Sequence, residues 1–581
     1  MRNSIIQIRK EYQKYLSEKD KNFRQLQKLL ELNRNNTKKV NDNLIKIIAN
    51  ESVLWQAYEN LKTNNGASAK KPTIKDAERI EFNETNIEKI KNLVKNLRKE
   101  KFEWASVRKV DTFDKKKKRP LKIVFFEDKI IQEAIRMVLN AIYEPTFTKI
   151  NNNHGFRPKM SFHTAMEEVR KNGKGKTHAI EGEILKVYDK LNHKILMNIL
   201  EKRIKDKKFL RLIKKGLQFG IEINTKIKHS IIGVPQRSIC GPVLFNIYMN
   251  EFDMAVGEII KRIVKVINEK EKRHEKKSST SQNKEYRIIQ IKIHEISKKI
   301  KREIKANKPI KTLLKRKRQL TIKMKKKSVT DYSKRIIEYK YIRYANDWMI
   351  LTNGNERICE KIAHELKEWL KEKLEIKIHE TKTKIINLKK SPLKFLGFSM
   401  MISNDNRKLK NKSNITSSKT INVGLKVGID DEKIMKTLKE KGFIDENEKI
   451  RHVPRLIQYK PWEIVEQFAS IIRGIFNYYY HAINVKLRLN KYHYILRFSC
   501  YKTIASRYKS TIRDVIIKHG INVIIEDPKK KIRKIPLCRE IMNDQWKLSE
   551  ERIKMLTKTN RIENVKEKTR YEKDPFSVKI R

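Results

Sequence analysis

The sequence predicts an α+β fold with two or three packed cores. Segments whose apolar residues recur at helical intervals alternate with short segments rich in β-branched and aromatic residues, and the last third of the chain has mostly helical patterns. With 581 residues the chain exceeds a typical single domain. Hydrophobic residues make up 39% of it, which is enough to fill more than one core.

The charge balance predicts a polyanionic partner. Lys and Arg number 136 against 68 Asp and Glu, so the formal net charge is +68, and the excess is spread along the whole chain. Such a surface binds nucleic acid by neutralising phosphates and releasing counterions. The alternative is an ordinary solvated surface in a protein from a lysine-biased genome.

Cysteine usage and hydropathy exclude several other classes. Four widely separated cysteines are too few for a disulfide-built protein and are not spaced as a paired zinc site: Cys240, Cys359, Cys500 and Cys538. We expect a reducing compartment. Apolar runs stay short of the ~18 residues of a membrane span. The N-terminal sequence lacks a secretory apolar core, and its acidic residues argue against an import presequence, so we expect the protein to work where it is made.

The first elements are a helix, a basic hairpin and a second helix. Apolar spacing predicts a helix over residues 43–62, which the Asn64-Asn65-Gly66 turn ends. Aromatic and β-branched residues over 102–126 flank the basic tip 114–120 and predict a β-hairpin. Residues 127–142 return to the helical pattern.

Further elements follow the same rules. A strand is predicted at 178–184, an amphipathic helix over 191–217, a turn at 233–236 and an apolar helix over 243–252. Lys and Arg then dominate residues 261–340, which predicts a charged helical insertion between two strands. The later expectations are a hairpin at 341–351, a helix at 356–374, a strand at 394–398, a linker at 404–418 and helices over 461–520.

Several short motifs resemble one family in order. Tyr344-Ala345-Asn346-Asp347 resembles the Tyr-Ala-Asp-Asp turn of reverse transcriptases. Other blocks resemble successive blocks of the group II intron reverse transcriptase and maturase family: 118–134, 154–158, 180–184, 189–193, 235–239 and 395–397. Residues 473–479 and 494–505 resemble its maturase, or X, domain. The resemblance covers roughly residues 44–520.

The resemblance implies a right-hand polymerase fold, with fingers, a palm that holds an antiparallel sheet, and a helical thumb. The expected divisions are a basic helical extension (1–42), fingers and first part of the palm (43–260), the Lys/Arg-rich insertion (261–340), the rest of the palm (341–403), a linker (404–460), the maturase domain or thumb (461–525) and a basic C-terminal tail (526–581).

The resemblance also implies a catalytic site at Glu183, Asn346 and Asp347, where polymerases of this family place three aspartates. Nucleotide addition needs two Mg²⁺ ions held by converging carboxylates at close to octahedral geometry. Glu183 keeps the charge but moves it by roughly one C–C bond, ~1.5 Å. Asn346 offers only a neutral carbonyl oxygen. Glu183 and Asp347 therefore remain as weak Mg²⁺ ligands at best.

A third departure from the family lies at Arg237. This bulky cation stands where the family has glycine in a Pro-Gln-Gly turn beside primer and template, and it restricts both backbone freedom and space. We therefore expect impaired or absent polymerase activity, with Mg²⁺ as a cofactor only if activity is retained. Neutral drift within an active enzyme is the alternative.

Cationic side chains near the expected nucleic-acid path are the candidate contacts. They are Lys117, Lys118, Arg119, Arg157, Arg237, Arg473, Arg497 and Lys502. Six thumb tyrosines could stack on bases, although for any single one the core is the more common place. These are Tyr478, Tyr479, Tyr480, Tyr492, Tyr494 and Tyr501.

The predicted function is that of a group II intron maturase, which binds intron RNA in a precursor mRNA and promotes its folding and splicing. The alternative is an active RNA-directed DNA polymerase that mediates intron mobility. We expect no membrane partner and no small-molecule substrate, and the sequence leaves a homodimer open. Enrichment in Lys, Ile and Asn suggests an organelle-encoded product, with the plastid favoured and the mitochondrion as the alternative.

Overall fold

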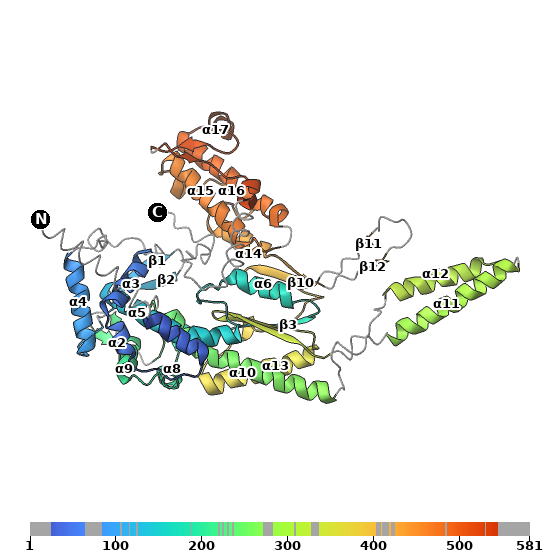
Figure 1. Ribbon diagram of the computed structural model, residues 1–581. Helices are drawn as coiled ribbons and strands as arrows, with labels where there is room; N and C mark the ends of the chain where they lie inside the picture. Colours follow the sequence, from blue (N-terminus) through green and yellow to red (C-terminus); the bar gives the residue numbers. More distant parts are fainter. Residues whose placement is uncertain are drawn as a thin grey trace.

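The computed structural model describes residues 25–543 apart from several internal segments. These are 64–83, 105–106, 115–116, 124–125, 186, 219–220, 224–225, 229–231, 235–237, 271–282, 307–308, 327–335, 403–407, 410–417, 420–423, 483–484 and 529. Figure 1 shows an N-terminal helical body beside a central sheet, a C-terminal helical unit above that sheet, and a pair of helices that extends away from it.

The N-terminal body packs around the long helix α5. Its helices are α2 (Leu44–Ile48), α3 (Glu51–Thr63), α4 (Glu84–Arg98), α5 (Phe126–Ile150), α8 (His193–Glu201) and α9 (Lys207–Leu217). The single helix expected over 43–62 is α2 and α3, interrupted at Ala49 and Asn50. The helix expected over 191–217 is likewise divided into α8 and α9.

Asp206 explains that second division. Its carboxylate accepts a hydrogen bond from the backbone N–H of Phe209 (3.0 Å), which caps α9, and another from the N–H of Ile45 (2.8 Å) on α2. The apolar pattern continues across the break because α8 and α9 both face the same core.

A small sheet lies beside this body in the order β2-β1-β4-β5. Its strands are β1 (Val107–Asp114), β2 (Lys117–Ile123), β4 (Ile221–Ile223) and β5 (Lys226–Lys228). The hairpin of β1 and β2 was expected, but its tip is shorter than 114–120, because Lys117 to Pro120 pair with Asp114 to Asp111. Pro120 is tolerated there because β2 is an edge strand.

The central sheet is antiparallel and has the order β6-β7-β3-β8. It consists of β3 (His178–Glu183), β6 (Tyr339–Tyr344), β7 (Asp347–Thr352) and β8 (Lys384–Asn387), which confirms the predicted strand and hairpin. The helices α10 (Gly241–Lys270) and α13 (Glu356–Leu374) cover one face, and α6 (Phe162–Asn172) covers the other (Figure 1). Consecutive residues therefore enter different cores: Ile180 and Ile350 one, Ala179 and Met349 the other.

The C-terminal unit begins earlier than expected. Its elements are β9 (Leu393–Phe395), β10 (Phe398–Ile402), β13 (Leu425–Ile429), α14 (Asp431–Glu440), α15 (Pro461–Tyr478), α16 (Val485–Tyr508) and α17 (Ile512–His519). The expectation of a linker over 404–460 is wrong beyond residue 424, because β13 pairs with β10 and α14 buries Ile434 and Leu438. Residues up to 543 also belong here, since Ile535 and Ile541 are buried in the same core.

The predicted insertion contains a pair of helices, α11 (Lys284–Lys305) and α12 (Lys311–Lys326), which pack against each other. We call this pair the helical arm. It begins later than expected because α10 continues as far as Lys270. In the part of the chain that the structure describes, no helix is long and apolar enough to cross a membrane.

A buried ion pair joins α10 to the central sheet. The Arg343 guanidinium on β6 donates to both carboxylate oxygens of Asp253 on α10 (2.7 and 2.6 Å), and the two side chains are 0% and 3% exposed. Tyr341 donates its hydroxyl to the same carboxylate (2.8 Å). Two-point pairing of this kind satisfies the charges that burial would otherwise penalise.

Replacing Asp253 with alanine should lower the free energy of unfolding by about 3–5 kcal/mol, because it leaves the buried Arg343 without a counterion. Chemical denaturation followed by circular dichroism measures this loss. Glu251→Ala on the same helix is the matched control, because Glu251 pairs with the largely exposed Lys202 (2.9 Å) and should cost less than about 1 kcal/mol. Equal losses would contradict the role given to burial.

Candidate functional site

The candidate site lies at the turn that joins β6 to β7. Ala345 and Asn346 form this turn, and Ala345 has a φ of +55°, a left-handed conformation that costs an alanine roughly 1–2 kcal/mol. The Arg343 guanidinium donates to the carbonyl of Ala345 (3.0 Å). Gly155 packs so closely on the turn that a Cβ there would lie 2.4 Å from the Ala345 nitrogen. The turn is therefore held from two sides.

The fold brings together the three residues predicted for the catalytic site. Glu183 ends β3 directly opposite Asp347 at the start of β7. The N–H of Ile184 donates to the carbonyl of Asn346 (3.0 Å), which ties the turn to the end of β3. All three side chains are partly exposed, so they are accessible from solvent.

Lys382 is a site residue that the sequence reasoning missed. Its ammonium lies 2.7 Å from a carboxylate oxygen of Glu183, and the N–H of His379 donates to the Glu183 carbonyl (2.8 Å). The short 3-10 helix Glu380–Lys382 places it there. Nothing in the sequence distinguishes this lysine from the many others, because the contact joins segments about 200 residues apart.

Burial and mutual repulsion perturb two carboxyl groups of the site. The pKa of Asp347 is raised to about 6, chiefly by desolvation and then by the charge of Glu183. The pKa of Glu181, two residues before Glu183 on β3, is raised to about 7 by desolvation and by the charge of Asp347. Both groups favour the neutral form more than an ordinary carboxyl does.

These residues do not fit a pair of divalent ions. Asn346 supplies no charge, and the Lys382 ammonium occupies an oxygen of Glu183 that a metal would need. Within the described ranges, no group of three or more His, Cys, Asp or Glu side chains is arranged to hold a metal ion. The geometry therefore supports a partly exposed carboxylate site in which a lysine of the protein pairs with Glu183.

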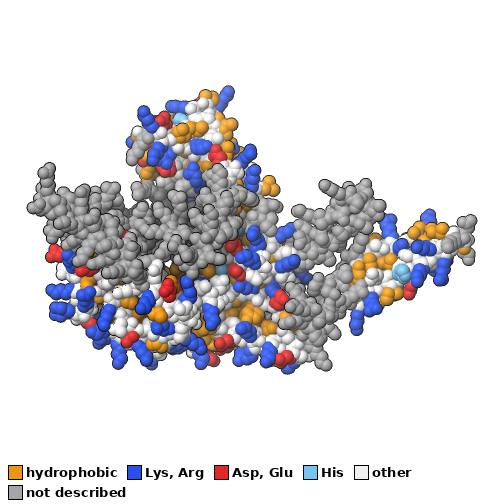
Figure 2. Space-filling model, viewed as in Figure 1, with side chains coloured by type: hydrophobic (Ala, Val, Ile, Leu, Met, Phe, Trp, Pro, Cys, Tyr) orange, Lys and Arg blue, Asp and Glu red, His pale blue; other side chains and the backbone are white. Residues whose placement is uncertain are grey.

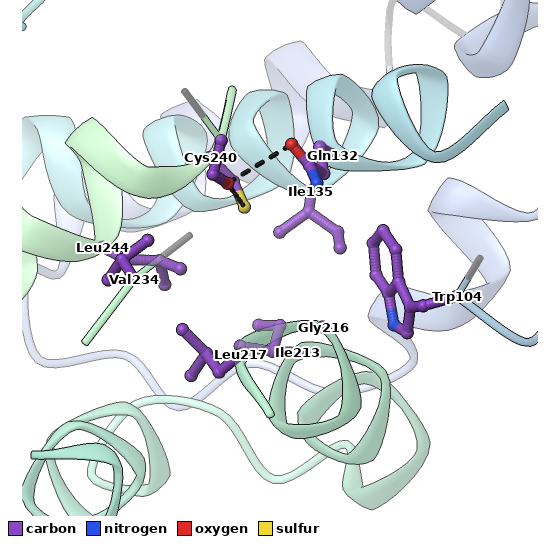
Figure 3. Close-up of a pocket in the computed structure, with 10 residues that line it drawn as sticks. Trp104, Gln132, Ile135, Ile213, Gly216, Leu217, Val234, Cys240 and Leu244 are labelled. Carbon is purple, nitrogen blue, oxygen red and sulfur yellow. Dashed lines mark hydrogen bonds between the residues drawn. The ribbon is translucent and has the colours of Figure 1, made fainter. Parts of the chain in front are cut away.

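Gln132 on α5 positions Ser238 and Ile239, which directly follow the predicted Pro-Gln-Arg turn at residues 235–237. Its side-chain oxygen accepts from the N–H of Ile239 (2.9 Å) and from the hydroxyl of Ser238 (3.2 Å). Figure 3 shows Gln132 beside a small, mostly apolar pocket lined by Trp104, Ile135, Leu217 and Leu244 among others. Cys240 also lines it, and burial raises the pKa of its thiol to about 11, which keeps the thiol neutral. This pocket supports the loop and offers no reactive group. Arg237 lies outside the described residues.

One predicted nucleic-acid contact is structural in this fold. Arg157 is buried, with a side chain 1% exposed, and it pairs with Glu144 (2.7 Å) and donates to the carbonyl of Asn153 (2.7 Å). The expectation for Arg157 is corrected, because its guanidinium is already used inside the protein. Lys502 is half-buried and donates to the backbone carbonyl of Ile450 (2.7 Å), and its contact with nucleic acid stays a prediction.

The other predicted contacts differ in position. Arg473 on α15 is exposed, and Arg497 on α16 is half-buried, with its guanidinium carbon 5.9 Å from the centre of the Phe498 ring. Lys117, Lys118 and Arg119 lie on β2, and their side chains are outside the described part of the structure.

Most of the predicted thumb tyrosines belong to the core. Tyr479, Tyr492 and Tyr501 are buried, and Tyr478 donates its hydroxyl to the carbonyl of Leu396 (2.8 Å). Tyr494 is 48% exposed and packs against Phe498 with ring centroids 4.3 Å apart. Tyr494, Arg497 and Phe498, together with the exposed Lys491, form an aromatic and basic patch that we call the α16 patch.

Basic side chains are scattered over the described parts of the visible face of the molecule (Figure 2). In Figure 2 Lys and Arg are spread over the N-terminal body, the C-terminal unit and the helical arm, with few acidic groups between them. This distribution matches the excess of cations in the sequence.

Comparisons with known proteins agree with this arrangement. A reverse transcriptase (RNA-dependent DNA polymerase) family model matches residues 107–266, and a type II intron maturase model matches residues 424–569. The reverse transcriptase match ends inside α10 and does not include the Asn346–Asp347 turn. This turn lies beside Glu183 because β7 pairs with β3 in the fold. The structure is thus a reverse-transcriptase-like α+β fold with antiparallel sheets, as the sequence predicted.

Curated relatives extend the similarity over most of the chain. The group II intron-encoded protein LtrA of Lactococcus lactis subsp. cremoris is 32% identical over 502 residues, which cover 84% of this chain and 79% of that protein. The uncharacterized 91 kDa protein in the cob intron of Schizosaccharomyces pombe is 29% identical, over 88% of this chain and 60% of that protein. Because LtrA is 32% identical over 84% of this chain and 79% of its own length, the chain belongs to the family of group II intron-encoded proteins.

Proposed function

We propose that this protein is a maturase that binds group II intron RNA in a precursor mRNA and promotes its folding and splicing. A maturase-type C-terminal unit and a widely basic surface support this function, because RNA folding requires neutralisation of crowded phosphates. Binding to the folded RNA stabilises the splicing-competent structure by mass action. The RNA itself performs the splicing chemistry.

The right-hand description belongs to the same proposal. The N-terminal body and the sheet β2-β1-β4-β5 correspond to fingers, the central sheet to the palm, and α15 to α17 to the thumb. The exposed Arg473 and the α16 patch are the proposed thumb contacts, and the basic strand β2 is the proposed fingertip contact. The proposal keeps the predicted divisions, except that it includes β9 and β10 in the C-terminal unit and extends this unit to at least residue 543.

Impaired polymerase activity is the second part of the proposal. The observation that carries it is the ion pair of Lys382 with Glu183 beside the uncharged Asn346. Reverse transcription requires divalent ions between converging carboxylates, and here one carboxylate is replaced and another is paired internally. An active polymerase that uses Mg²⁺ and mediates intron mobility remains the alternative function.

We also propose an organelle-encoded product. Relatives include a mitochondrial protein of Marchantia polymorpha, 25% identical over 72% of this chain, as well as the bacterial LtrA. These relatives favour the mitochondrial alternative over the plastid that composition suggested. We propose no small-molecule substrate. Sedimentation of the purified protein would test whether it forms a homodimer.

Restoring the family's carboxylates should restore polymerization. The double variant Glu183→Asp with Asn346→Asp should extend a primer on an RNA template with Mg²⁺ about a hundredfold faster than the natural sequence, which corresponds to roughly 2.7 kcal/mol of transition-state stabilisation. Primer extension with purified protein measures this. Robust, processive synthesis by the natural sequence would overturn the impaired-polymerase proposal.

Splicing assistance should be independent of the carboxylate site. Asp347→Ala should accelerate splicing of a precursor RNA that contains the intron encoding this chain as well as the natural protein does, within about twofold, because the RNA performs the chemistry. Time courses of splicing in vitro at fixed Mg²⁺ measure the rate. If the natural protein has no effect on splicing, the maturase function itself is wrong.

The raised pKa of Glu181 predicts a pH-dependent stability. The folded protein holds a proton on Glu181 more tightly than the unfolded chain does, so folding loses stability as the pH rises from about 4.5 toward 7. Glu181→Gln removes this titration and should raise the melting temperature at pH 8 but not at pH 4.5. Thermal unfolding at both pH values measures it. A stabilisation that is the same at both pH values would show that the carboxyl charge is not responsible.

A further inference from the structure

Among the described helices, α12 of the helical arm has the highest proportion of Lys and Arg. The two helices of the arm contain sixteen Lys and Arg and three Glu, and α12 has no acidic residue. Even if every glutamate pairs with a cation, most of the positive charge stays uncompensated. Figure 1 shows the arm extending away from the central sheet, so this charge is presented on a projecting element.

A thin apolar seam holds the two helices together. On α11 the apolar positions Ile289, Ile293, Ile296 and Ile300 recur with the 4-3-4 spacing of a coiled-coil seam, and Ile300 is 7% exposed. On α12 the positions Leu313, Leu320 and Met324 follow the same spacing, with Lys317 in the remaining position. The seam uses one face of each helix and leaves the basic faces to solvent.

The arm is inserted between α10 and β6, and these two elements are hydrogen-bonded to each other. The N–H of Ile337, just before β6, donates to the side chain of Asn268 near the end of α10 (3.1 Å). The hydroxyl of Tyr339 on β6 donates to the carbonyl of Gly257 on α10 (3.3 Å). The chain therefore leaves and re-enters the body at one place, beside the strand that leads to Asn346.

Two kinds of partner could bind the arm, a second copy of it or a polyanion, and electrostatics favours the polyanion. Exposed aliphatic side chains such as Ile288, Ile291, Leu314 and Ile322 could pack on a second copy of the arm. Two arms with this charge repel each other, and the repulsion is reduced only by salt. A polyanion is attracted by the same charges and gains further from counterion release.

The side chains of the arm favour base-paired RNA over a single strand. Proteins that bind single strands without sequence preference stack bases on aromatic side chains. Tyr286 is the one Phe, Tyr or Trp in α11 and α12. A helix of 22 residues is about 33 Å long, which is enough to follow phosphates across a groove of an RNA stem.

We infer that the helical arm is a second RNA-binding element, which binds the phosphate backbone of a base-paired stem independently of its sequence. The inference rests on the proposed function for the identity of the polyanion, and it adds a site separate from the α16 patch and from the carboxylate site. Contact through phosphates alone makes the arm tolerant of sequence, so it positions the body on the RNA.

The test removes four exposed cations of α12 in the full-length protein. The arm variant carries Lys315→Gln, Arg316→Gln, Arg318→Gln and Lys323→Gln, and glutamine keeps the helix because its helix propensity is close to that of lysine. Binding is measured for a 16-base-pair RNA duplex and for a single strand of the same length over a range of salt concentrations. We expect duplex affinity to fall by about tenfold or more, and the slope of log K against log salt to become shallower by about 2–4. Single-strand affinity should change less.

Two controls separate the arm from total charge and from misfolding. Arg357→Gln, Lys361→Gln, Lys371→Gln and Lys373→Gln remove the same charge from the exposed face of α13 and should lower duplex affinity by less than about threefold. Lys315→Arg with Lys323→Arg keeps the charge on α12 and should bind as the natural protein does. Equal losses in the α12 and α13 variants, or an unchanged duplex affinity in the α12 variant, would overturn the inference.

The failure of the two proposals can be told apart. If the natural protein binds the precursor RNA and assists splicing while the arm variant binds duplex normally, only the arm inference is wrong. If the natural protein neither binds the precursor nor assists splicing, the maturase function is wrong whatever the duplex measurements give.

Discussion

The buried pair of Arg343 and Asp253 is the interaction on which the candidate site depends. The guanidinium uses two donors on the Asp253 carboxylate and a third on the Ala345 carbonyl, so one side chain fixes both the packing of β6 on α10 and the shape of the turn. The backbone of Arg343 also bonds Asn152 and His154 (2.8 Å each), which brings the Gly155 loop onto the turn. The strained conformation of Ala345 persists because the surroundings determine it from several directions.

The site at this turn combines a rigid backbone with little negative charge. Glu183 and Asp347 face each other across β3 and β7. Asn346 removes one negative charge, Lys382 adds a positive one, and desolvation raises the pKa values of Asp347 and Glu181. Each change lowers the negative charge available to a dication. The backbone geometry is explained by the core, because Trp348 covers Gly182 on the neighbouring strand and leaves no space for a Cβ.

Connectivity explains how a long insertion is tolerated beside such a site. The helical arm enters and leaves between α10 and β6, where Asn268 and Tyr339 tie the two elements together. Its helices complete their own seam, so the arm adds charge without changing the packing of the central sheet. Loop closure at a fixed base costs little more as the inserted segment grows.

Elements with a local signal could be predicted from the sequence alone. The strand at β3, the hairpin of β6 and β7, the helix α13 and the helical C-terminal unit follow from periodicity and strand propensity, and the ordered motifs placed Glu183, Asn346 and Asp347 in one site. Tertiary structure decided what depends on neighbours distant in the chain. It divided α8 from α9 at Asp206, joined β13 to β10 where a linker was expected, and buried Arg157 in internal hydrogen bonds. It also placed Lys382 on Glu183. A lysine or arginine looks alike in sequence whether its charge meets solvent, a phosphate or a buried carboxylate, because the partner that decides its role is supplied only by the fold.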